Sequence, residues 1–355
     1  MPNLHIAGDP PMTKALVAAG AFAADPVIVV DVGARGGVEW YWKVFGQHLR
    51  IVAFEPDAKE CARLNAAGDP QVTFIAAALG AENGPRTLYV TRHAASTTFY
   101  PTVPEWGRRY AFADNLAVES EVVVQTTTLR DALGGRRPDF IKLDAEGAEL
   151  DVLRGADLEP VLGLIAELNF GQSPSGQPSF ADFDIHCRAN GLQLYDLDVY
   201  RFSRMALPYP YLYDSRDADG RPVAGPTIQG QLLSSDALYF RDALSSAKPV
   251  KQACLFEIFG LADCAAETVQ AHRDAFARWV DPDRLLDLLV PEVKGQRLGY
   301  REYVARHAAD PLFRPTPGWR QPPKQVSQYD GVFIPAWLGF RQRLYWAWRA
   351  LRHRL

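Results

Sequence analysis

Residues 26–37 read PVIVVDVGARGG, an apolar run that ends in an acid and a cluster of glycines. An unbroken run of β-branched residues of this length favours a buried strand, and the glycines allow a sharp turn directly after it. The residues that follow, VEWYWKVFGQHL (38–49), are compatible with a helix. A strand, a glycine-rich turn and a helix in this order are typical of the first unit of an α/β fold, where a ligand lies against the strand end and the helix N-terminus.

Six further apolar runs repeat the strand pattern along the chain, separated by polar stretches that suit helices or loops. They are RIVAFEPD (50–57), VTFIAAALG (72–80), DFIKLDAEG (139–147), LGLIAELNF (162–170), LQLYDLDV (192–199) and DALYF (236–240). Strands spaced in this way predict a doubly wound, mostly parallel sheet. Two more segments, RTLYVTR (86–92) and SEVVVQTTTL (120–129), leave no room for a helix of their own and predict an antiparallel addition.

Three regions follow from the changes in sequence pattern. We expect an N-terminal extension over 1–26, an α/β domain over 27–242 and, after a boundary near 243, a helical and Pro-rich C-terminal region over 243–355. The α/β domain carries two aromatic insertions, 93–119 and 200–234, which are too long for ordinary connections and favour a functional role.

The composition of the 355 residues is that of a folded globular protein, with 48% hydrophobic and 23% charged residues. Lys and Arg number 38 against 42 Asp and Glu, and this net charge of −4 argues against a nucleic-acid partner. The four cysteines show no metal-ligand or disulfide spacing, which favours a reducing, cytoplasmic environment. No stretch approaches the ~18 apolar residues needed to span a bilayer, and the N-terminus lacks the pattern of a secretory signal.

The motif DVGARGG (31–37) and the acid Glu55 together point to a nucleoside-containing cofactor. Glu55 follows the second expected strand, 24 residues after Asp31, where a carboxylate accepts hydrogen bonds from both ribose hydroxyls. The segment reads DxGxxGG and so differs from the dinucleotide fingerprint GxGxxG. A glycine-rich turn with an unrelated surface acid is the alternative that this motif alone leaves open.

Together with FEPD (54–57), AALG (77–80) and DFIKLDAEGAELDVLRGA (139–156), the motif resembles the FkbM family of S-adenosylmethionine-dependent methyltransferases. The resemblance covers about residues 27–240. It implies a Rossmann-like sheet of the class I methyltransferase type, S-adenosylmethionine as cofactor, and methyl transfer to a hydroxyl of a sugar or natural product.

The same resemblance implies a cofactor site. It places the methionine end of the cofactor at Asp31, Gly33 and Gly37. It places the ribose at Glu55 and adenine near residues 77–79. Ser96 stands where family members commonly carry a serine after the third strand, and a turn hydroxyl is its other interpretation. The full set of expected cofactor-binding residues is Asp31, Gly33, Ala34, Arg35, Gly37, Glu55, Pro56, Ala78, Ser96 and Asp144.

Acids and a lysine gather at the expected carboxyl edge of the sheet, where open α/β folds bind ligands. Asp144 ends the strand DFIKLD and is the candidate general base, since methyl transfer to an alcohol requires in-line positioning and removal of the hydroxyl proton. Lys142 alternates with Asp144, so the two side chains share a face of the strand, although a solvated strand-edge lysine is the other interpretation. Glu146 and Glu149 suit the first turn of the next helix, and Glu149 is the more structural of the two.

Glu167 and Asn169 alternate on the neighbouring strand and share a face at the same edge. With Asp144 they could hold a Mg²⁺ ion that orients a diol, or they could hydrogen-bond substrate hydroxyls directly. The catalytic candidates are Asp144, Glu146, Lys142 and Glu167, and no metal ligand is assigned. His93 is a candidate for substrate contact, whereas His186 fits a packed helical position.

The segment 335–355 combines five arginines with a helical apolar stripe and contains no acid. The stripe consists of Trp337, Phe340, Leu344, Trp348, Leu351 and Leu355. Such a helix lies in an anionic membrane surface or packs against protein, so peripheral membrane contact and self-association both stay open.

We therefore expect a cytoplasmic O-methyltransferase with a small-molecule or glycan acceptor. An NAD-dependent sugar-modifying oxidoreductase is disfavoured, because the chain lacks GxGxxG and a YxxxK-type catalytic pair in the right place. A non-catalytic assembly module is the third alternative. It would require a failed cofactor pocket, yet Asp31, Gly33 and Glu55 are all present.

Overall fold

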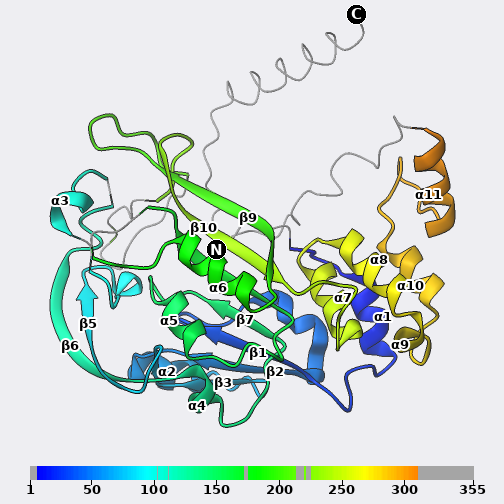
Figure 1. Cartoon of the computed structure of the whole chain (residues 1–355), viewed down its shortest axis with the longest axis horizontal. Coiled ribbons are helices and arrows are strands. Elements are labelled where there is room, and N and C mark those ends of the chain that lie inside the picture. The colour runs from blue at the N-terminus through cyan, green and yellow to red at the C-terminus, as the bar shows by residue number, and fades with distance from the viewer. Residues whose placement is uncertain are drawn as a thin grey trace, which may run out of the picture.

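A sheet of seven strands forms the centre of the computed structural model, which describes residues 6–101, 103–110, 112–171, 175–212, 220 and 225–310 (Figure 1). The strands are β1 (Val27–Val32), β2 (Leu49–Phe54), β3 (Val72–Ile75), β7 (Phe140–Leu143), β8 (Gly163–Asn169), β9 (Gln193–Phe202) and β10 (Gln231–Phe240). Their order in the sheet is β3-β2-β1-β7-β8-β10-β9. Neighbours from β3 to β8 pair in parallel, and β10 is antiparallel to both β8 and β9.

This topology confirms the expected Rossmann-like, mostly parallel sheet of the class I methyltransferase type, with helices in the C-terminal region. The strand order reverses at β1, because β2 lies on one side of it and β7 on the other. Loops that leave the carboxyl ends of β1 and β7 therefore diverge to opposite faces of the sheet. A crevice between such loops is where open α/β sheets bind ligands.

Alternating apolar residues of β1 contribute to two cores, one on each face of the sheet. Val27 and Val29 belong to the first core, and Val30 and Val32 belong to the second. Buried residues of the first core come from α1 (Pro11–Ala18), the 3₁₀ helix η1 (Trp40–His48), α2 (Ala58–Ala66), α7 (Pro249–Ile258), α8 (Ala262–Ala271), α9 (Arg273–Ala277) and α10 (Pro282–Leu289). Those of the second core come from α4 (Leu129–Leu133), α5 (Glu149–Arg154) and α6 (Phe180–Ala189).

A second, three-stranded sheet has the order β4-β6-β5 and confirms the antiparallel addition. Its strands are β4 (Ala78–Leu79), β5 (Gly84–Thr91) and β6 (Val118–Thr127). The expectation of one strand over 72–80 is wrong, because the chain leaves β3 at Ile75 and then pairs with β6 as β4. Between β5 and β6 lie the 3₁₀ helix η2 (Ala94–Ser96) and α3 (Pro104–Gly107).

Two further expectations need correction. The segment 38–49 forms the 3₁₀ helix η1 rather than a regular α-helix, and Gly46 interrupts it with a non-helical φ of 51°. The insertion after β9 is shorter than 200–234, because the ladder between β9 and β10 extends to the pair Phe202 and Gln231. Cross-strand pairing therefore takes residues at both ends of that insertion into the sheet.

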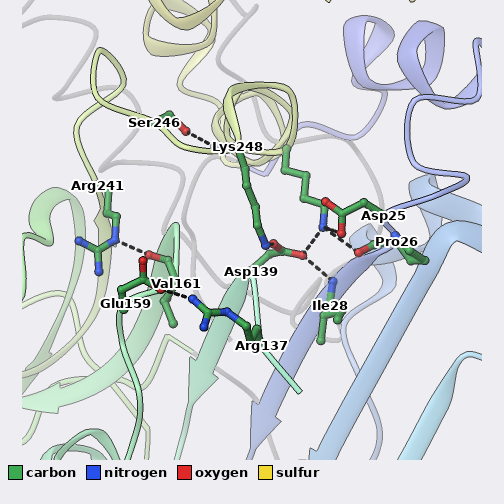
Figure 2. A network of polar contacts seen from close by, with 11 residues as sticks. Asp25, Pro26, Ile28, Arg137, Asp139, Glu159, Val161, Arg241, Ser246 and Lys248 are labelled. Carbon is green, nitrogen blue, oxygen red and sulfur yellow. Dashed lines mark hydrogen bonds and ion pairs between the residues drawn. The ribbon is translucent and has the colours of Figure 1, made fainter. Parts of the chain in front are cut away.

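Asp139, at the amino end of β7, links the sheet to α7 (Figure 2). Its buried carboxylate accepts hydrogen bonds from the Ile28 N–H at 2.9 Å, from Lys248 Nζ at 2.6 Å and from Lys251 Nζ at 2.8 Å. Lys251 also donates to the Asp25 carboxylate at 2.7 Å. These contacts fix the C-terminal helices at the edge of the sheet opposite to the one where Asp144 follows β7.

The N-terminal helix α1 docks on α7 through the buried carboxylate of Glu257. This group accepts hydrogen bonds from the N–H groups of Met12 and Thr13, at 2.9 and 2.7 Å, and from the Thr13 hydroxyl at 2.6 Å. Both helices contribute to the first core beside the sheet. The division of the chain near residue 243 stays a prediction.

The remaining described helix, α11 (Tyr300–Ala309), has no fully buried residue. No helix within the described residues is long and apolar enough to cross a membrane. The predicted amphipathic helix at 335–355 lies outside the described residues.

Candidate active site

The loops after β1 and β7 touch at Gly33, and only glycine fits there. Gly33 has a φ of 78°, and a Cβ at this position would lie 1.8 Å from the carbonyl oxygen of Asp144. The N–H groups of Gly33 and Ala34 both donate to the carbonyl of Phe54 at 3.0 Å, which holds this loop against the end of β2. A residue with a side chain at this position would push the two loops apart.

A cavity of about 390 Å³ opens at this point, within the ~300 to 1,000 Å³ typical of small-molecule sites. Six residues of the expected cofactor set line it, namely Gly33, Arg35, Glu55, Pro56, Ala78 and Asp144. Apolar residues of the second sheet, among them Leu88, Val90 and Val124, close its other side. The expected cofactor residues therefore converge on one cavity from four separate segments of the chain.

The other four residues of the set lie apart from this lining. Asp31 and Ala34 are buried behind it, each about 1% exposed, and Gly37 is not among the lining residues. Ser96 lines a neighbouring cavity instead, where its Oγ lies 3.4 Å from His93 Nδ1. Its neighbours Ala94, Ala95 and Thr97 line the main cavity, whereas Ser96 does not.

Glu55 projects from the end of β2 into the 390 Å³ cavity and is 4% exposed. Its Oε1 accepts a hydrogen bond from the N–H of Asp57 at 2.8 Å and lies 3.6 Å from Arg35 Nη1. Burial raises the pKa of Glu55 above its ordinary value, and the backbone hydrogen bond and Arg35 oppose this rise. The backbone contact leaves the other carboxylate oxygen for a ligand.

Lys142 on β7 stands between two acids of the crevice. Its Nζ lies 3.2 Å from Asp31 Oδ1 and 3.4 Å from Asp144 Oδ2. Burial lowers the pKa of Lys142, but the charges of Asp31, Asp144 and Glu39 outweigh it and raise the pKa above the ordinary value. Burial raises the pKa of Asp31, against the opposing effect of Lys142. Two carboxylates within 3.4 Å of Nζ thus favour the charged form of Lys142.

The loop from Asp144 to Gly147 is shaped by the carboxylate of Glu149. Oε1 of Glu149 accepts hydrogen bonds from the N–H groups of Ala145 and Gly147, at 2.8 and 3.1 Å. Burial raises the pKa of Glu149 to about 7, against the effect of these bonds. Glu146 adopts a φ of 50°, unusual for a residue with a side chain, and its carbonyl accepts a hydrogen bond from the Thr98 hydroxyl at 2.6 Å. Glu149 thus orders the loop from Asp144 to Gly147. The hydrogen bond from Thr98 connects the insertion after β5 to this loop.

Two smaller cavities adjoin the first, and carboxylates stand where they meet. Asp144 lines both the 390 Å³ cavity and one of about 220 Å³, and Glu146 lines the first and one of about 270 Å³. Glu167, on β8, lines both smaller cavities. Burial and neighbouring acids raise the pKa of Glu146 and of Glu167 well above the ordinary value. Three of the four catalytic candidates thus each line two of the three cavities, and the fourth, Lys142, lines the 220 Å³ cavity.

The 220 Å³ cavity also contains residues that the sequence patterns did not single out. Asp236 on β10 pairs with Glu167 in the sheet register and accepts a hydrogen bond from the Tyr200 hydroxyl at 2.7 Å. Burial raises the pKa of Asp236 to about 6, against the effect of Tyr200. Glu39 and Tyr41 reach the cavity from the segment of η1. A polar residue at the start of DALYF was the available signal for Asp236, but only antiparallel pairing places it beside Glu167.

The described residues contain no group of three or more His, Cys, Asp or Glu side chains placed to hold a metal ion. Asn169 lines the 270 Å³ cavity with Glu167, whereas Asp144 does not reach that cavity. His93 lines it as well. His186 lies on α6, where burial lowers its pKa, and it lines none of the three cavities.

Residues 31–191 match the family described as the methyltransferase FkbM domain. The chain thus contains a domain of this family, a class of S-adenosylmethionine-dependent methyltransferases, and S-adenosylmethionine is its cofactor. The match begins at Asp31 and includes the loops after β1, β2 and β7 that form the crevice.

Solved methyltransferase structures are similar to the chain at low identity. Magnesium protoporphyrin IX methyltransferase from Synechocystis PCC 6803, with bound S-adenosylmethionine, is 11% identical over 65% of this chain and 80% of its own, with a TM-score of 0.29. A TehB-like S-adenosylmethionine-dependent methyltransferase from Corynebacterium glutamicum is 12% identical over 64% and 87%, with a TM-score of 0.29. The 1,6-didemethyltoxoflavin-N1-methyltransferase of Burkholderia thailandensis is 12% identical over 66% and 79%, with a TM-score of 0.27. No curated protein matches the chain.

Proposed function

We propose that this methyltransferase transfers the methyl group of S-adenosylmethionine to a hydroxyl of a sugar, a glycan or a glycosylated metabolite. The observation that carries the proposal is the position of Asp144, which lines both the 390 Å³ cavity and the carboxylate-lined 220 Å³ cavity beside it. A carboxylate at such a junction can bind an acceptor hydroxyl next to the methyl donor and take up its proton.

The larger cavity fits the cofactor in size and in chemistry. S-adenosylmethionine supplies an activated methyl group on its sulfonium sulfur. Glu55 would accept hydrogen bonds from the ribose hydroxyls, and Ala78 with the apolar residues of β5 and β6 would contact adenine. Gly33 and Asp144 both line this cavity, and we place the methionine end of the cofactor beside them.

The smaller cavities suit a polyhydroxylated acceptor. The carboxyl groups of Glu167 and Asp236 can exchange hydrogen bonds with hydroxyls, and Tyr41 and Phe202 line the same cavity with aromatic rings that suit a sugar ring. Lys142 keeps its proton, so it serves to hold Asp144 rather than to act as base. We assign proton removal to Asp144 and the binding of the other acceptor hydroxyls to Glu146, Glu167 and Asp236.

Calorimetric titration of the purified protein tests the cofactor part of the proposal. S-adenosylmethionine and S-adenosylhomocysteine should bind and NAD should not. The Glu55→Ala variant should bind S-adenosylhomocysteine more weakly by ~1.5 to 3 kcal/mol, the scale of hydrogen bonds to a charged group. Glu159→Ala, which removes an exposed carboxylate at the opposite edge of the sheet, is the matched control. Binding of NAD would instead favour the oxidoreductase alternative.

A panel assay tests the acceptor. Radiolabelled S-adenosylmethionine is incubated with the protein and with free monosaccharides, methyl glycosides, glycosylated natural products and aglycones, and alkali-stable label in the acceptor is measured. Label in glycosides that is lost when the hydroxyls are blocked supports O-methylation of a sugar. Label confined to amines or aglycones would contradict it.

The cellular compartment belongs to the same proposal. All four cysteines are free thiols, and three of them are buried. Free thiols in this number suit a reducing compartment, which supports a cytoplasmic enzyme.

A further inference from the structure

Arg35 occupies the part of the 390 Å³ cavity that the proposed function assigns to ribose. The residue lies in the loop after β1, and its guanidinium extends across to the end of β2. Nη1 lies 3.6 Å from Glu55 Oε1, and Nη2 lies 3.5 Å from Asp57 Oδ2. The Arg35 side chain is 38% exposed, whereas that of Glu55 is 5% exposed, so the arginine covers a nearly buried carboxylate from the solvent side.

A ribose diol held by both oxygens of the Glu55 carboxylate would share Oε1 with this guanidinium. Glu55 Oε1 already accepts the N–H of Asp57 at 2.8 Å, and Arg35 approaches that same oxygen. A diol bound bidentately would add one donor to Oε1 and one to the other carboxylate oxygen, inside the cavity that Arg35 and Glu55 both line. Three donors would then compete for Oε1, and Asp57 offers the arginine another partner when its contact with Glu55 lengthens.

We propose that Arg35 limits the affinity of the cofactor site, because its guanidinium competes with the ribose hydroxyls for Glu55. This inference rests on the assignment of Glu55 to the ribose. Arg35 belongs to the expected cofactor-binding set, and the inference gives it a role that opposes binding. The competition would favour release of the demethylated product after transfer.

The expected effect is modest and carries an electrostatic signature. Partly exposed ion pairs contribute little, so removal of the Arg35 charge should tighten S-adenosylhomocysteine binding by about two- to fivefold. Salt weakens the Arg35 pairs by screening, because the Debye length falls from roughly 10 Å at about 0.1 M to roughly 3 Å at about 1 M. The difference between the wild type and an Arg35 variant should therefore shrink as salt is raised.

The test compares Arg35→Gln with the wild type by calorimetry, using two ligands at low and high NaCl. S-adenosylhomocysteine is the first ligand, and 5′-methylthioadenosine, which keeps adenine and ribose but lacks the amino-acid end, is the second. Both should bind the variant about two- to fivefold more tightly at low salt. Arg35→Lys keeps the charge but lacks the planar guanidinium that contacts two carboxylates at once. Its affinity for both ligands should lie between the affinities of the wild type and of Arg35→Gln. Arg137→Gln removes an exposed, ion-paired arginine at the opposite edge and should change nothing.

Two outcomes would overturn the inference. Weaker binding of S-adenosylhomocysteine by Arg35→Gln, with unchanged binding of 5′-methylthioadenosine, would mean that Arg35 holds the amino-acid end of the cofactor. Unchanged binding of both ligands by Arg35→Gln would mean that the contact between Arg35 and Glu55 does not affect the free energy of binding.

A Glu55→Gln background separates this inference from the assignment on which it rests. If Glu55→Gln weakens both ligands and abolishes the effect of Arg35→Gln, the two residues are coupled as proposed. If Glu55→Gln weakens both ligands and Arg35→Gln still tightens them equally in that background, the competition for Glu55 is wrong while the ribose assignment stands. If Glu55→Gln leaves both ligands unchanged, the ribose assignment itself fails.

Discussion

Asp144 is the residue on which the proposed chemistry depends, since it adjoins both the cofactor cavity and the 220 Å³ cavity. Asp144→Asn preserves the shape of the side chain but removes the base. We expect turnover on the acceptor found in the panel to fall by ~10² or more, and S-adenosylhomocysteine affinity to change much less. Single-turnover kinetics and calorimetry measure the two effects separately. Turnover at the wild-type level would remove Asp144 from this role.

Treatment of the wild type with EDTA separates proton removal from a metal-assisted reaction. If Asp144 removes the proton without a metal ion, we expect EDTA to leave the activity unchanged. Loss of activity that added Mg²⁺ restores would instead support the alternative in which oxygen ligands at this edge hold an ion.

Glu149 makes stability depend on pH, because its pKa is raised from 4.5 to about 7 in the folded protein. The folded state binds this proton more tightly than the unfolded state does, so protonation stabilises the fold. The contribution is fully present below about pH 4.5 and is lost as pH rises through about 7. Glu149→Gln keeps an oxygen that accepts the Ala145 and Gly147 N–H groups. We therefore expect the difference in unfolding free energy, variant minus wild type, to increase between pH 4.5 and 7 in denaturant titrations. A difference that does not change with pH would contradict a raised pKa at Glu149.

At the level of elements, the junction between β7 and α7 depends on one buried carboxylate. Asp139 is fully buried and neutralises Lys251, which is itself about 5% exposed. Asp139→Asn leaves that ammonium with the largely exposed Asp25 as its acidic partner. Removing one member of a buried ion pair typically costs about 3 to 5 kcal/mol, and we expect a loss of unfolding free energy on this scale.

The neighbouring exposed pair Arg137 and Glu159 provides the control for this measurement (Figure 2). Glu159→Gln should change the unfolding free energy by less than about 1 kcal/mol, because exposed ion pairs contribute little. Equal effects of Asp139→Asn and Glu159→Gln in denaturant titrations would show that burial of the network has no energetic consequence.

At the level of the whole molecule, helices from both ends of the described chain pack in the first core of the central sheet. These are α1 at the N-terminal end and α7 to α10 at the C-terminal end. Phe140 of β7 stacks on Phe259 with ring centroids 5.0 Å apart, and Phe240 of β10 contacts Phe256 at 4.6 Å. A fragment of residues 27–242 would expose these rings, and each buried aromatic contributes ~1.5 to 3 kcal/mol. We expect this fragment to lack a cooperative thermal transition in circular dichroism. A fragment of residues 6–310 should retain one, and a stable 27–242 fragment would instead support an independent domain.

Much of the sheet could be predicted because its signals are local. The β-branched run before Asp31 and the apolar runs ending near Glu55, Asp144 and Asn169 each specify a strand without reference to their neighbours. The segment at 72–80 could not be divided correctly, because pairing of Ala78 with Thr126 depends on a partner distant in sequence. The packing of Trp42 of η1 against Phe140 and Phe259 likewise joins residues far apart in the chain, so no periodicity within the helix predicts it.

The sequence by itself determined the class of sheet, the family of the domain and the acids at the strand ends, since these depend on motifs and on side-chain alternation along single strands. Tertiary structure alone decided which acids face one another. Asp236 joins Glu167 because β10 runs antiparallel beside β8, and Arg35 covers Glu55 because the loop after β1 folds over the end of β2. It also decided that Glu149 binds backbone N–H groups while Glu146 faces the cavities. Distances of this kind depend on contacts between segments far apart in the chain, and pattern within one segment carries no information about them.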